Sequence, residues 1–257
     1  MSQGFSLYLA RDSGLHRLHP LTKLSLAATL LVAAFALPGP WSGYAMFLLV
    51  LLPLAGWGKI LTGFLRSVAR SVLPFAVSLF LIQGLLWPGG SPVARLGPLS
   101  LKAEGLAFAL ASTGRILMIV SSFLLLALST RPDLLMIALA QRGFPSTLSY
   151  IVVTTIQIVP YFQGKARAIL DAQRSRGLET EGGLQKRLRA LLPLIVPLVL
   201  SGILDVEERA IALEARAFGR RGTKTSLQVL SDSRAQSVLR WVILALAPLL
   251  LVAGLVL

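Results

Sequence analysis

Long apolar blocks separated by short polar connections dominate the hydrophobic pattern of this 257-residue chain. The blocks predict membrane-spanning helices at about residues 22–37, 44–57, 71–87, 105–129 and 240–257. Several blocks are shorter than the roughly 20 residues of a typical span, so weakly polar flanking residues must extend them or the bilayer must thin locally. The pattern predicts an all-α, polytopic helical membrane protein with about five transmembrane helices, and it leaves their number open between five and seven.

The positive charges set the expected orientation. Lys and Arg outnumber Asp and Glu by 25 to 11, for a formal net charge of +14, but they flank apolar blocks instead of covering a polar domain, which argues against nucleic acid as a partner. Basic connections stay in the cytoplasm. Lys59, Arg66 and Arg70, placed by the pattern between the second and third blocks, and the basic stretch 131–240 are therefore expected inside. The chain is predicted to be a multi-pass plasma-membrane protein with a cytoplasmic N-terminus.

Two shorter apolar runs, at residues 148–162 and 191–204, lie within the basic stretch. Runs of this length are more often buried or interfacial helices than spans. A helical hairpin that crosses the membrane would also keep both flanks inside, so charge leaves that alternative open. The pattern favours two membrane-proximal helices.

Each run passes directly into a charged amphipathic helix, at residues 164–178 and 205–219, and Gly177 and Gly219 are plausible C-terminal stops. The two helices share a motif forty positions apart, and we define these motifs as the two tips: Ser175-Arg176-Gly177 and Ala215-Arg216-Ala217. Small neighbours let a partner backbone approach, and an arginine offers a fork of donors to carboxylates or carbonyls. Two matched tips suggest two docking sites on a paired partner. The alternatives are a membrane-surface helix and an arginine that complements the helix dipole.

At these residues the chain is similar to the T component, the EcfT and CbiQ family, of energy-coupling-factor (ECF) ABC transporters, which carries two Ala-Arg-Ser or Ala-Arg-Gly motifs. The segment His16-Arg-Leu-His-Pro-Leu-Thr-Lys-Leu24 resembles the N-terminal motif of that family, and the resemblance extends from about Leu15 to Asp232. Two departures are Ala217, where the family has Gly, and His19, where it has Asp.

The resemblance implies a non-catalytic subunit without cofactors. Together with the hydropathy and charge pattern, it predicts a cytoplasmic N-terminal segment (1–21), transmembrane helices 1–4 (22–130), a coupling domain (131–236) and a C-terminal transmembrane helix (237–257). The implied partners are two cytoplasmic ABC ATPase subunits, a substrate-binding integral membrane (S) subunit and the lipid bilayer. Arg176 would dock on one ATPase and Arg216 on the other, for uptake of a vitamin or a transition-metal ion that a different chain binds.

Other candidate sites are few. Arg115 lies inside the fourth apolar block and is a candidate functional intramembrane charge, with snorkelling or pairing with a helix end as the alternative. His16 and His19 have no third ligand, so we expect a solvated interfacial pair and no metal site. The chain has no cysteine and no phosphate-binding glycine motif for ATP. An autonomous secondary carrier or channel is the alternative function, and an intramembrane enzyme lacks the clustered His, Asp or Glu that it would need.

Overall fold

The chain divides into two units, which a computed structural model describes over residues 8–37, 39–88, 91–96, 99–178, 183–218 and 230–256. The first, which we call the bundle unit, contains Leu7–Ser146 and Leu230–Leu257. The second contains Thr147–Val229 together with the first six residues. We call it the two-helix unit after α8 (Ser146–Ser175) and α9 (Leu184–Ala215), its described helices.

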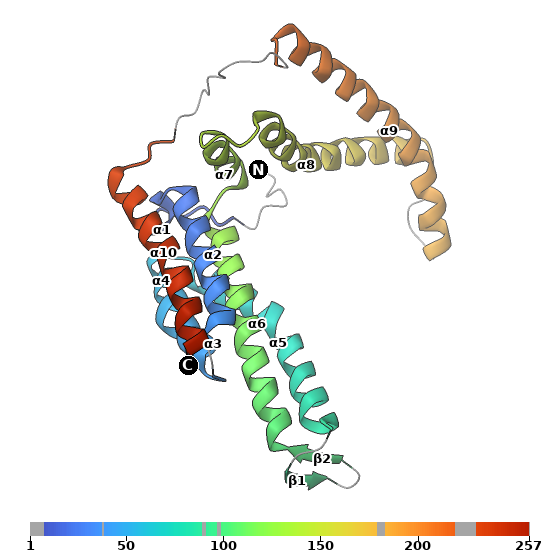
Figure 1. Cartoon of the computed structure of the whole chain (residues 1–257). Coiled ribbons are helices and arrows are strands. Elements are labelled where there is room, and N and C mark those ends of the chain that lie inside the picture. Colours follow the sequence, from blue (N-terminus) through green and yellow to red (C-terminus); the bar gives the residue numbers. More distant parts are fainter. Residues whose placement is uncertain are drawn as a thin grey trace. The chain divides into compact units, whose positions relative to one another are not determined.

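Helices make up almost all of the bundle unit (Figure 1). In chain order they are α1 (Gly14–Arg17), α2 (Pro20–Ala36), α3 (Ser42–Met46), the π-helical turn η1 (Phe47–Leu51), α4 (Leu52–Trp57), α5 (Leu61–Leu86), α6 (Ala103–Ser129), α7 (Pro132–Ala140) and α10 (Arg234–Val256). Among the described residues the only strands are β1 (Pro92–Leu96) and β2 (Leu99–Lys102), which form an antiparallel hairpin between α5 and α6. The predicted helical fold class is confirmed.

Each of the five long apolar blocks forms helix. Within the described residues, α5, α6 and α10 up to Gly254 are long and apolar enough to cross a membrane. The apolar helices at Pro20–Ala36 and Ser42–Trp57 are shorter. Pro53, which has no N–H to donate, lies two residues after the end of the π-helical turn η1, a local adjustment that allows the helix to continue past a proline.

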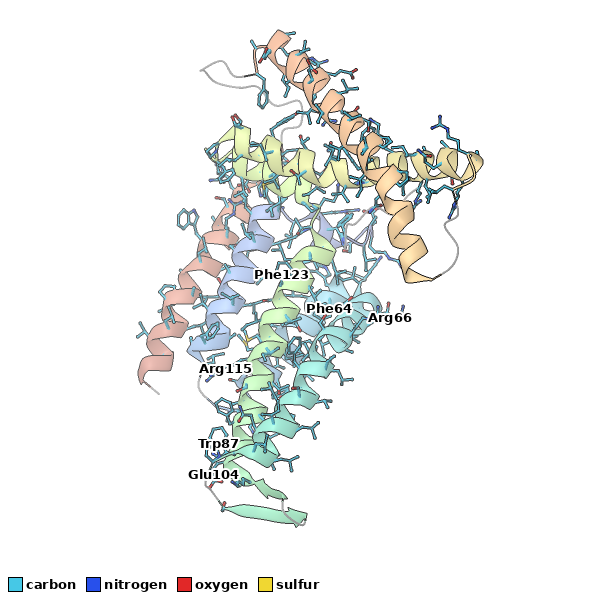
Figure 2. The ribbon with its side chains drawn as sticks, turned by 90° about the vertical axis from the view of Figure 1, so that its right-hand side faces the viewer. Phe64, Arg66, Trp87, Glu104, Arg115 and Phe123 are labelled. Atoms are coloured by element: carbon cyan, nitrogen blue, oxygen red, sulfur yellow. The ribbon has the colours of Figure 1, made fainter. Side chains whose placement is uncertain are left out.

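The prediction for the connection before the third block is wrong in one respect. Arg66 and Arg70 lie within α5, which begins at Leu61. Figure 2 shows the Arg66 side chain on α5, pointing away from the neighbouring helices. Hydropathy marks where a helix becomes apolar, whereas the backbone keeps its helical hydrogen bonds through exposed arginines, which are good helix formers. The same effect lets α10 begin at Arg234, before the apolar block starts.

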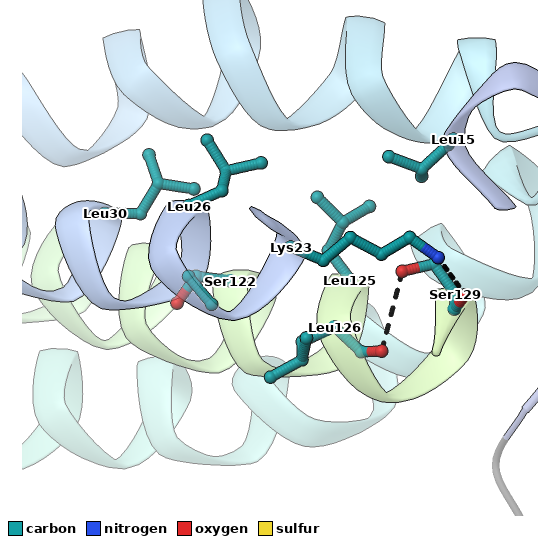
Figure 3. A pocket seen from close by; sticks show the side chains of 9 residues that line it. Leu15, Lys23, Leu26, Leu30, Ser122, Leu125, Leu126 and Ser129 are labelled. Atoms are coloured by element: carbon teal, nitrogen blue, oxygen red, sulfur yellow. Dashed lines mark hydrogen bonds between the residues drawn. The ribbon is translucent and has the colours of Figure 1, made fainter. Parts of the chain in front are cut away.

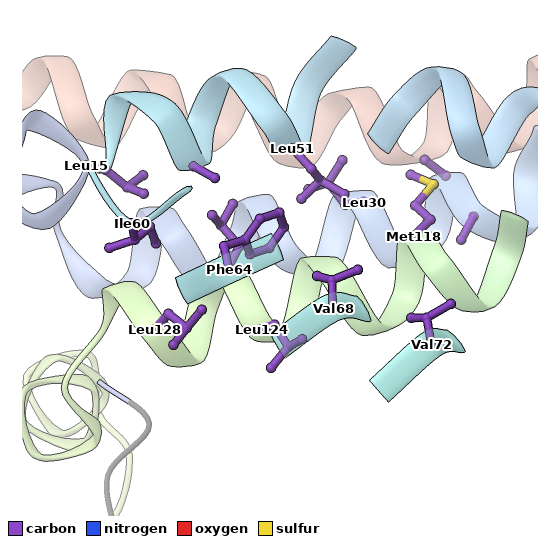
Figure 4. Packing of buried hydrophobic residues seen from close by; sticks show 14 residues of the cluster. Leu15, Leu30, Leu51, Ile60, Phe64, Val68, Val72, Met118, Leu124 and Leu128 are labelled. Carbon is purple, nitrogen blue, oxygen red and sulfur yellow. The ribbon is translucent and has the colours of Figure 1, made fainter. Parts of the chain in front are cut away.

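The core of the bundle unit is centred on Phe64 of α5, which is fully buried (Figure 4). The Phe64 ring stacks on that of Phe47, with ring centroids 6.1 Å apart. It receives side chains from α1, α2, η1, α4 and α6, among them Leu15, Leu30, Leu51, Ala55, Met118, Leu124 and Leu128. These apolar contacts fix α5 and α6 against α2.

Helix α10 packs along α2, although the two helices come from opposite ends of the chain (Figure 1). The Thr29 hydroxyl of α2 donates a hydrogen bond to the Ile243 carbonyl oxygen at 3.0 Å. Gly254 lies so close to the Ala36 carbonyl that a Cβ atom at this position would overlap it. Small residues allow such close approach of membrane helices.

Candidate functional site

The two helices that carry the tips cross each other (Figure 1, Figure 2). At the crossing, the Lys165 ammonium of α8 forms an ion pair with Asp205 of α9, with Nζ 2.5 Å from Oδ2. A Cβ atom at Gly202 would lie 2.9 Å from the nearest atom of the Phe162 ring, so the glycine allows the ring to pack close to the backbone of α9. Each apolar run and its amphipathic continuation form one uninterrupted helix, as the sequence predicts.

The ion pair at the crossing shifts both of its groups toward the charged form. The hydrogen bond from Lys165 lowers the pKa of the Asp205 carboxyl below its ordinary value of 3.8. The hydrogen bond to Asp205 raises the pKa of Lys165 above 10.5. The Lys165 ammonium also lies 5.2 Å from the centre of the Tyr161 ring, a cation–π distance. The pair is therefore charged on both sides at neutral pH.

The first tip is a helix C-terminus closed by a Schellman motif. The Leu178 N–H donates to the Gln173 carbonyl at 3.0 Å, and the Gly177 N–H donates to the Arg174 carbonyl at 2.9 Å. Gly177 has φ +91°, the left-handed conformation that glycine adopts without a steric penalty. Arg176 is therefore the last residue before the chain turns away from the α8 axis.

The second tip repeats this geometry. The Phe218 N–H donates to the Leu213 carbonyl at 3.0 Å, and the Ala217 N–H donates to the Glu214 carbonyl at 2.9 Å. The left-handed residue is Ala217, with φ +54°. The predicted stop at Gly219 is therefore wrong: the helix ends at Ala215, and an alanine accepts the strained conformation. Gly219 itself lies outside the described residues.

Both arginines are exposed at the ends of their helices. From Asp171 to Leu178 the pattern of exposed and half-buried positions is identical to that from Ile211 to Phe218. Neither Arg176 nor Arg216 forms an ion pair with a residue that the structure describes. Two equivalent guanidinium groups are thus free to contact a partner.

The helices run in opposite directions through the crossing. Tyr150, near the start of α8, contacts Phe218 after the end of α9, with ring centroids 4.8 Å apart. Arg176 follows Lys165 by eleven residues, as Arg216 follows Asp205. At about 1.5 Å per residue each tip lies about 17 Å along its helix from the crossing, so the tips can be up to about 33 Å apart.

The helices also present large apolar side chains on their surfaces. The exposed ones are Leu148, Ile151, Val152, Ile156, Val159 and Tyr161 on α8, and Ile195, Val196, Val199, Leu200, Ile203, Leu204, Val206 and Ile211 on α9. Exposed apolar side chains in such number are typical of contact with a membrane or another protein.

Arg115 lies close to the midpoint of α6, and its side chain is exposed on the bundle unit (Figure 2). No ion pair connects it to another described residue. From residue 115 either end of α6 is about 18–21 Å away at 1.5 Å per residue, beyond the reach of an arginine side chain. The guanidinium therefore cannot reach either end of α6.

The histidines are not the solvated pair that we expected. His19 is 6% exposed, and its Nδ1 accepts a hydrogen bond from the Leu21 N–H at the start of α2. Burial lowers the pKa of both His16 and His19, which favours neutral imidazoles. Within the described part of the chain no three His, Asp or Glu side chains gather as ligands for a metal ion.

Lys23 is a buried charge that the sequence did not single out. Its ammonium donates to the Ser129 carbonyl at 2.7 Å and to the His16 carbonyl at 3.3 Å. The side chain lines a cavity of about 10 Å³. Figure 3 shows it directed at the C-terminal end of α6. A cation here compensates the partial negative charge of the helix end. A single lysine in the first turn of an apolar helix, three residues after Pro20, was the available signal.

Residues 11–227 match the CbiQ family, described as cobalt transport protein. The chain belongs to this family. One CbiQ relative, the energy-coupling factor transporter transmembrane protein EcfT of Thermanaerovibrio acidaminovorans, is 33% identical over 82% of this chain and 81% of its own length. Proteins of the same name from Lacticaseibacillus paracasei and Listeria innocua are 28% and 29% identical, over 95% and 84% of this chain and 96% and 84% of their own lengths. The match includes both tips and the crossing.

Proposed function

We propose that this chain is the transmembrane coupling (T) subunit of an energy-coupling-factor importer and that its two tips dock on two cytoplasmic ATPase subunits. The observation that carries the proposal is the matched pair of Schellman-capped helix ends, each exposing an arginine, at equal distances from one crossing. Paired ATPases present two similar grooves, and a protein with two equivalent tips can engage both at once. The names of the relatives support the same assignment.

The apolar surfaces of α8 and α9 fit a membrane partner. In this proposal they lie against the inner side of the bilayer and contact the S subunit, which binds the vitamin or metal ion. Closure of the ATPases would move the two tips, and the crossing would convert that movement into a tilt of the apolar segments under the S subunit. This is helix-in-groove recognition followed by a rigid-body change.

The orientation follows from the same proposal. ATP is in the cytoplasm, so both tips, the segment 131–236 and the N-terminus (1–21) would lie inside. The helices within residues 22–130 and 237–257 would be the membrane part of a multi-pass plasma-membrane protein. The basic residues between Arg131 and Arg240 are consistent with that orientation. This chain would perform no chemistry itself and would need no cofactor.

A double charge reversal tests the docking directly. Arg176→Glu combined with Arg216→Glu is expected to leave the protein in the membrane, to release the ATPases during purification and to abolish transport. The matched control is Arg167→Glu with Arg209→Glu, which makes the same charge change at exposed positions of the same helices. If the tip variant keeps its ATPases and imports normally, the docking assignment is wrong. Import by the reconstituted chain without any ATPase would instead support the autonomous carrier.

A further inference from the structure

We infer that Arg142, Asp232 and Arg240 form a charged clasp within the bundle unit, which holds together the two points where the chain leaves for the two-helix unit and returns from it, so that movement of the tips is passed to the bundle instead of separating these two points. We call these three residues the clasp. The inference rests on the proposed function and adds to it the residues through which the movement passes.

Asp232 is the centre of the clasp. Its Oδ2 lies 2.6 Å from Nη2 of Arg142, and Nη2 of Arg240 donates to Oδ1 at 2.9 Å and to Oδ2 at 2.7 Å. The side chains of Asp232 and Arg240 are 19% and 10% exposed, whereas that of Arg142 is 53% exposed. One carboxylate thus joins a buried arginine of α10 to an exposed arginine of another segment.

The clasp residues flank the two-helix unit in the sequence. Arg142 follows α7 and precedes α8 by a few residues, and Asp232 precedes α10. The two-helix unit, Thr147–Val229, is the stretch between them. The Arg142–Asp232 pair therefore closes a loop of 90 residues at the points where the chain enters and leaves that unit.

A second contact connects the clasp to α2. The His19 N–H donates to Oε1 of Gln236, in the first turn of α10, at 2.8 Å. Because α2 and α10 pack along each other, the clasp is attached to a pair of packed helices and not to one surface loop. A displacement of Asp232 therefore acts on α10 and α2 together.

The clasp is charged at physiological pH. Burial alone would raise the pKa of Asp232, but the hydrogen bonds from Arg240 and Arg142 outweigh it and hold that pKa below 3.8. The neighbouring charged or titratable groups that act on Asp232 are Arg240, Arg142 and His19. Two arginines pair with one ionised carboxylate. The exposed Arg142 can therefore be substituted while the ion pair between Arg240 and Asp232 remains.

The same chain offers a matched control. Arg131 pairs with Asp133 at 2.6 Å, and the Arg131 side chain is 53% exposed, the same distance and exposure as for Arg142 with Asp232. The Arg131–Asp133 pair joins residues only two positions apart, so it connects no distant segments of the chain. An effect of the Arg142 pair that the Arg131 pair lacks must therefore come from what it connects.

The test compares Arg142→Asp with Arg131→Asp in the complex purified with its ATPases and S subunit. Arg142→Asp is expected to keep the ATPases and to hydrolyse ATP, while substrate moved per ATP falls at least about fivefold, the lower end of coupling between sites. Arg131→Asp should match the original protein in both measurements. Unchanged transport per ATP in Arg142→Asp overturns the clasp.

A covalent replacement provides the second variant. The chain has no cysteine, so Arg142→Cys with Ser231→Cys places two thiols at the clasp and leaves the Asp232–Arg240 pair intact. Joining them with a bifunctional thiol reagent is expected to restore transport per ATP. A link that forms without restoring transport would contradict the inference. It would show that holding these two segments together is not what transport requires.

Linking the thiols in membranes without ATPases separates the two proposals. If the link forms there but the original chain never retains ATPases, the proposed function fails and the clasp geometry stands. If the ATPases bind but the two thiols cannot be linked, the clasp fails and the proposed function stands.

Discussion

Lys165 and Asp205 form the ion pair at the crossing of α8 and α9, and they stand forty residues apart in the sequence, the same offset that relates Arg176 to Arg216. Equivalent positions of the repeated motif therefore meet each other at the crossing. Both arginines follow it by eleven residues. The repeated motif therefore places the two tips at equivalent positions about one point, which is the arrangement that the proposed docking on two ATPases needs.

Reversing the charges at the crossing should be more harmful singly than together. Lys165→Asp places two carboxylates against each other, so we expect transport to fall severalfold and α8 and α9 to lose protection in hydrogen exchange. Lys165→Asp with Asp205→Lys restores opposite charges and should recover most of the loss. A double variant as impaired as the single one would show that this pair does not hold the crossing.

The crossing should also be insensitive to pH over a wide range. Asp205 has a lowered pKa, so its contribution to stability is present above its ordinary value of 3.8 and is lost as pH falls through the lower folded value. Lys165 has a raised pKa, so its contribution is present below 10.5 and is lost as pH rises through the higher folded value. The difference in melting temperature between the original protein and Lys165→Met should therefore stay constant between about pH 5 and 9. A difference that changes steadily across that range would contradict the assignment.

The two tips should respond in opposite directions to an exchange of alanine and glycine. A left-handed conformation costs a residue with a Cβ about 1 kcal/mol, so Ala217→Gly should stabilise the last turn of α9. Gly177→Ala should destabilise the last turn of α8 by a similar amount, because Gly177 also has a positive φ. Hydrogen exchange of the two terminal turns measures both effects. Changes of the same sign in both variants would show that the caps are not equivalent.

Arg115 should matter to assembly and not to folding. A charge at the centre of a membrane helix costs about 2.5–3.5 kcal/mol on insertion scales, so Arg115→Leu should insert at least as well as the original chain. We expect Arg115→Leu to retain less of the S subunit during purification, because a group of the S subunit that pairs with the guanidinium would lose its partner. Arg115→Lys keeps the charge and should retain more. If Arg115→Leu retains the S subunit fully, Arg115 is a lipid-facing charge that the protein tolerates and has no role in assembly.

The sequence predicts the helices well because apolar blocks and prolines act locally. Arg66 and Arg70 were misplaced because hydropathy follows side chains, while the helix follows backbone hydrogen bonds. Ala217 was missed as a stop because its left-handed conformation is unusual for alanine and the glycine two residues later is the stronger signal. The contacts of Lys23 with Ser129 and of Asp232 with Arg142 join residues 106 and 90 positions apart. Periodicity contains no information about such pairs.

Cross-linking from the tips tests the central claim most directly. In the cysteine-free chain, Arg176→Cys and Arg216→Cys can each carry a short thiol-reactive cross-linker in the complex purified with its ATPases. The account predicts that each single variant links to one ATPase and that the double variant yields a product with two. Labelling of either cysteine by a membrane-impermeant thiol reagent outside intact cells, or an absence of links to any ATPase, would contradict it.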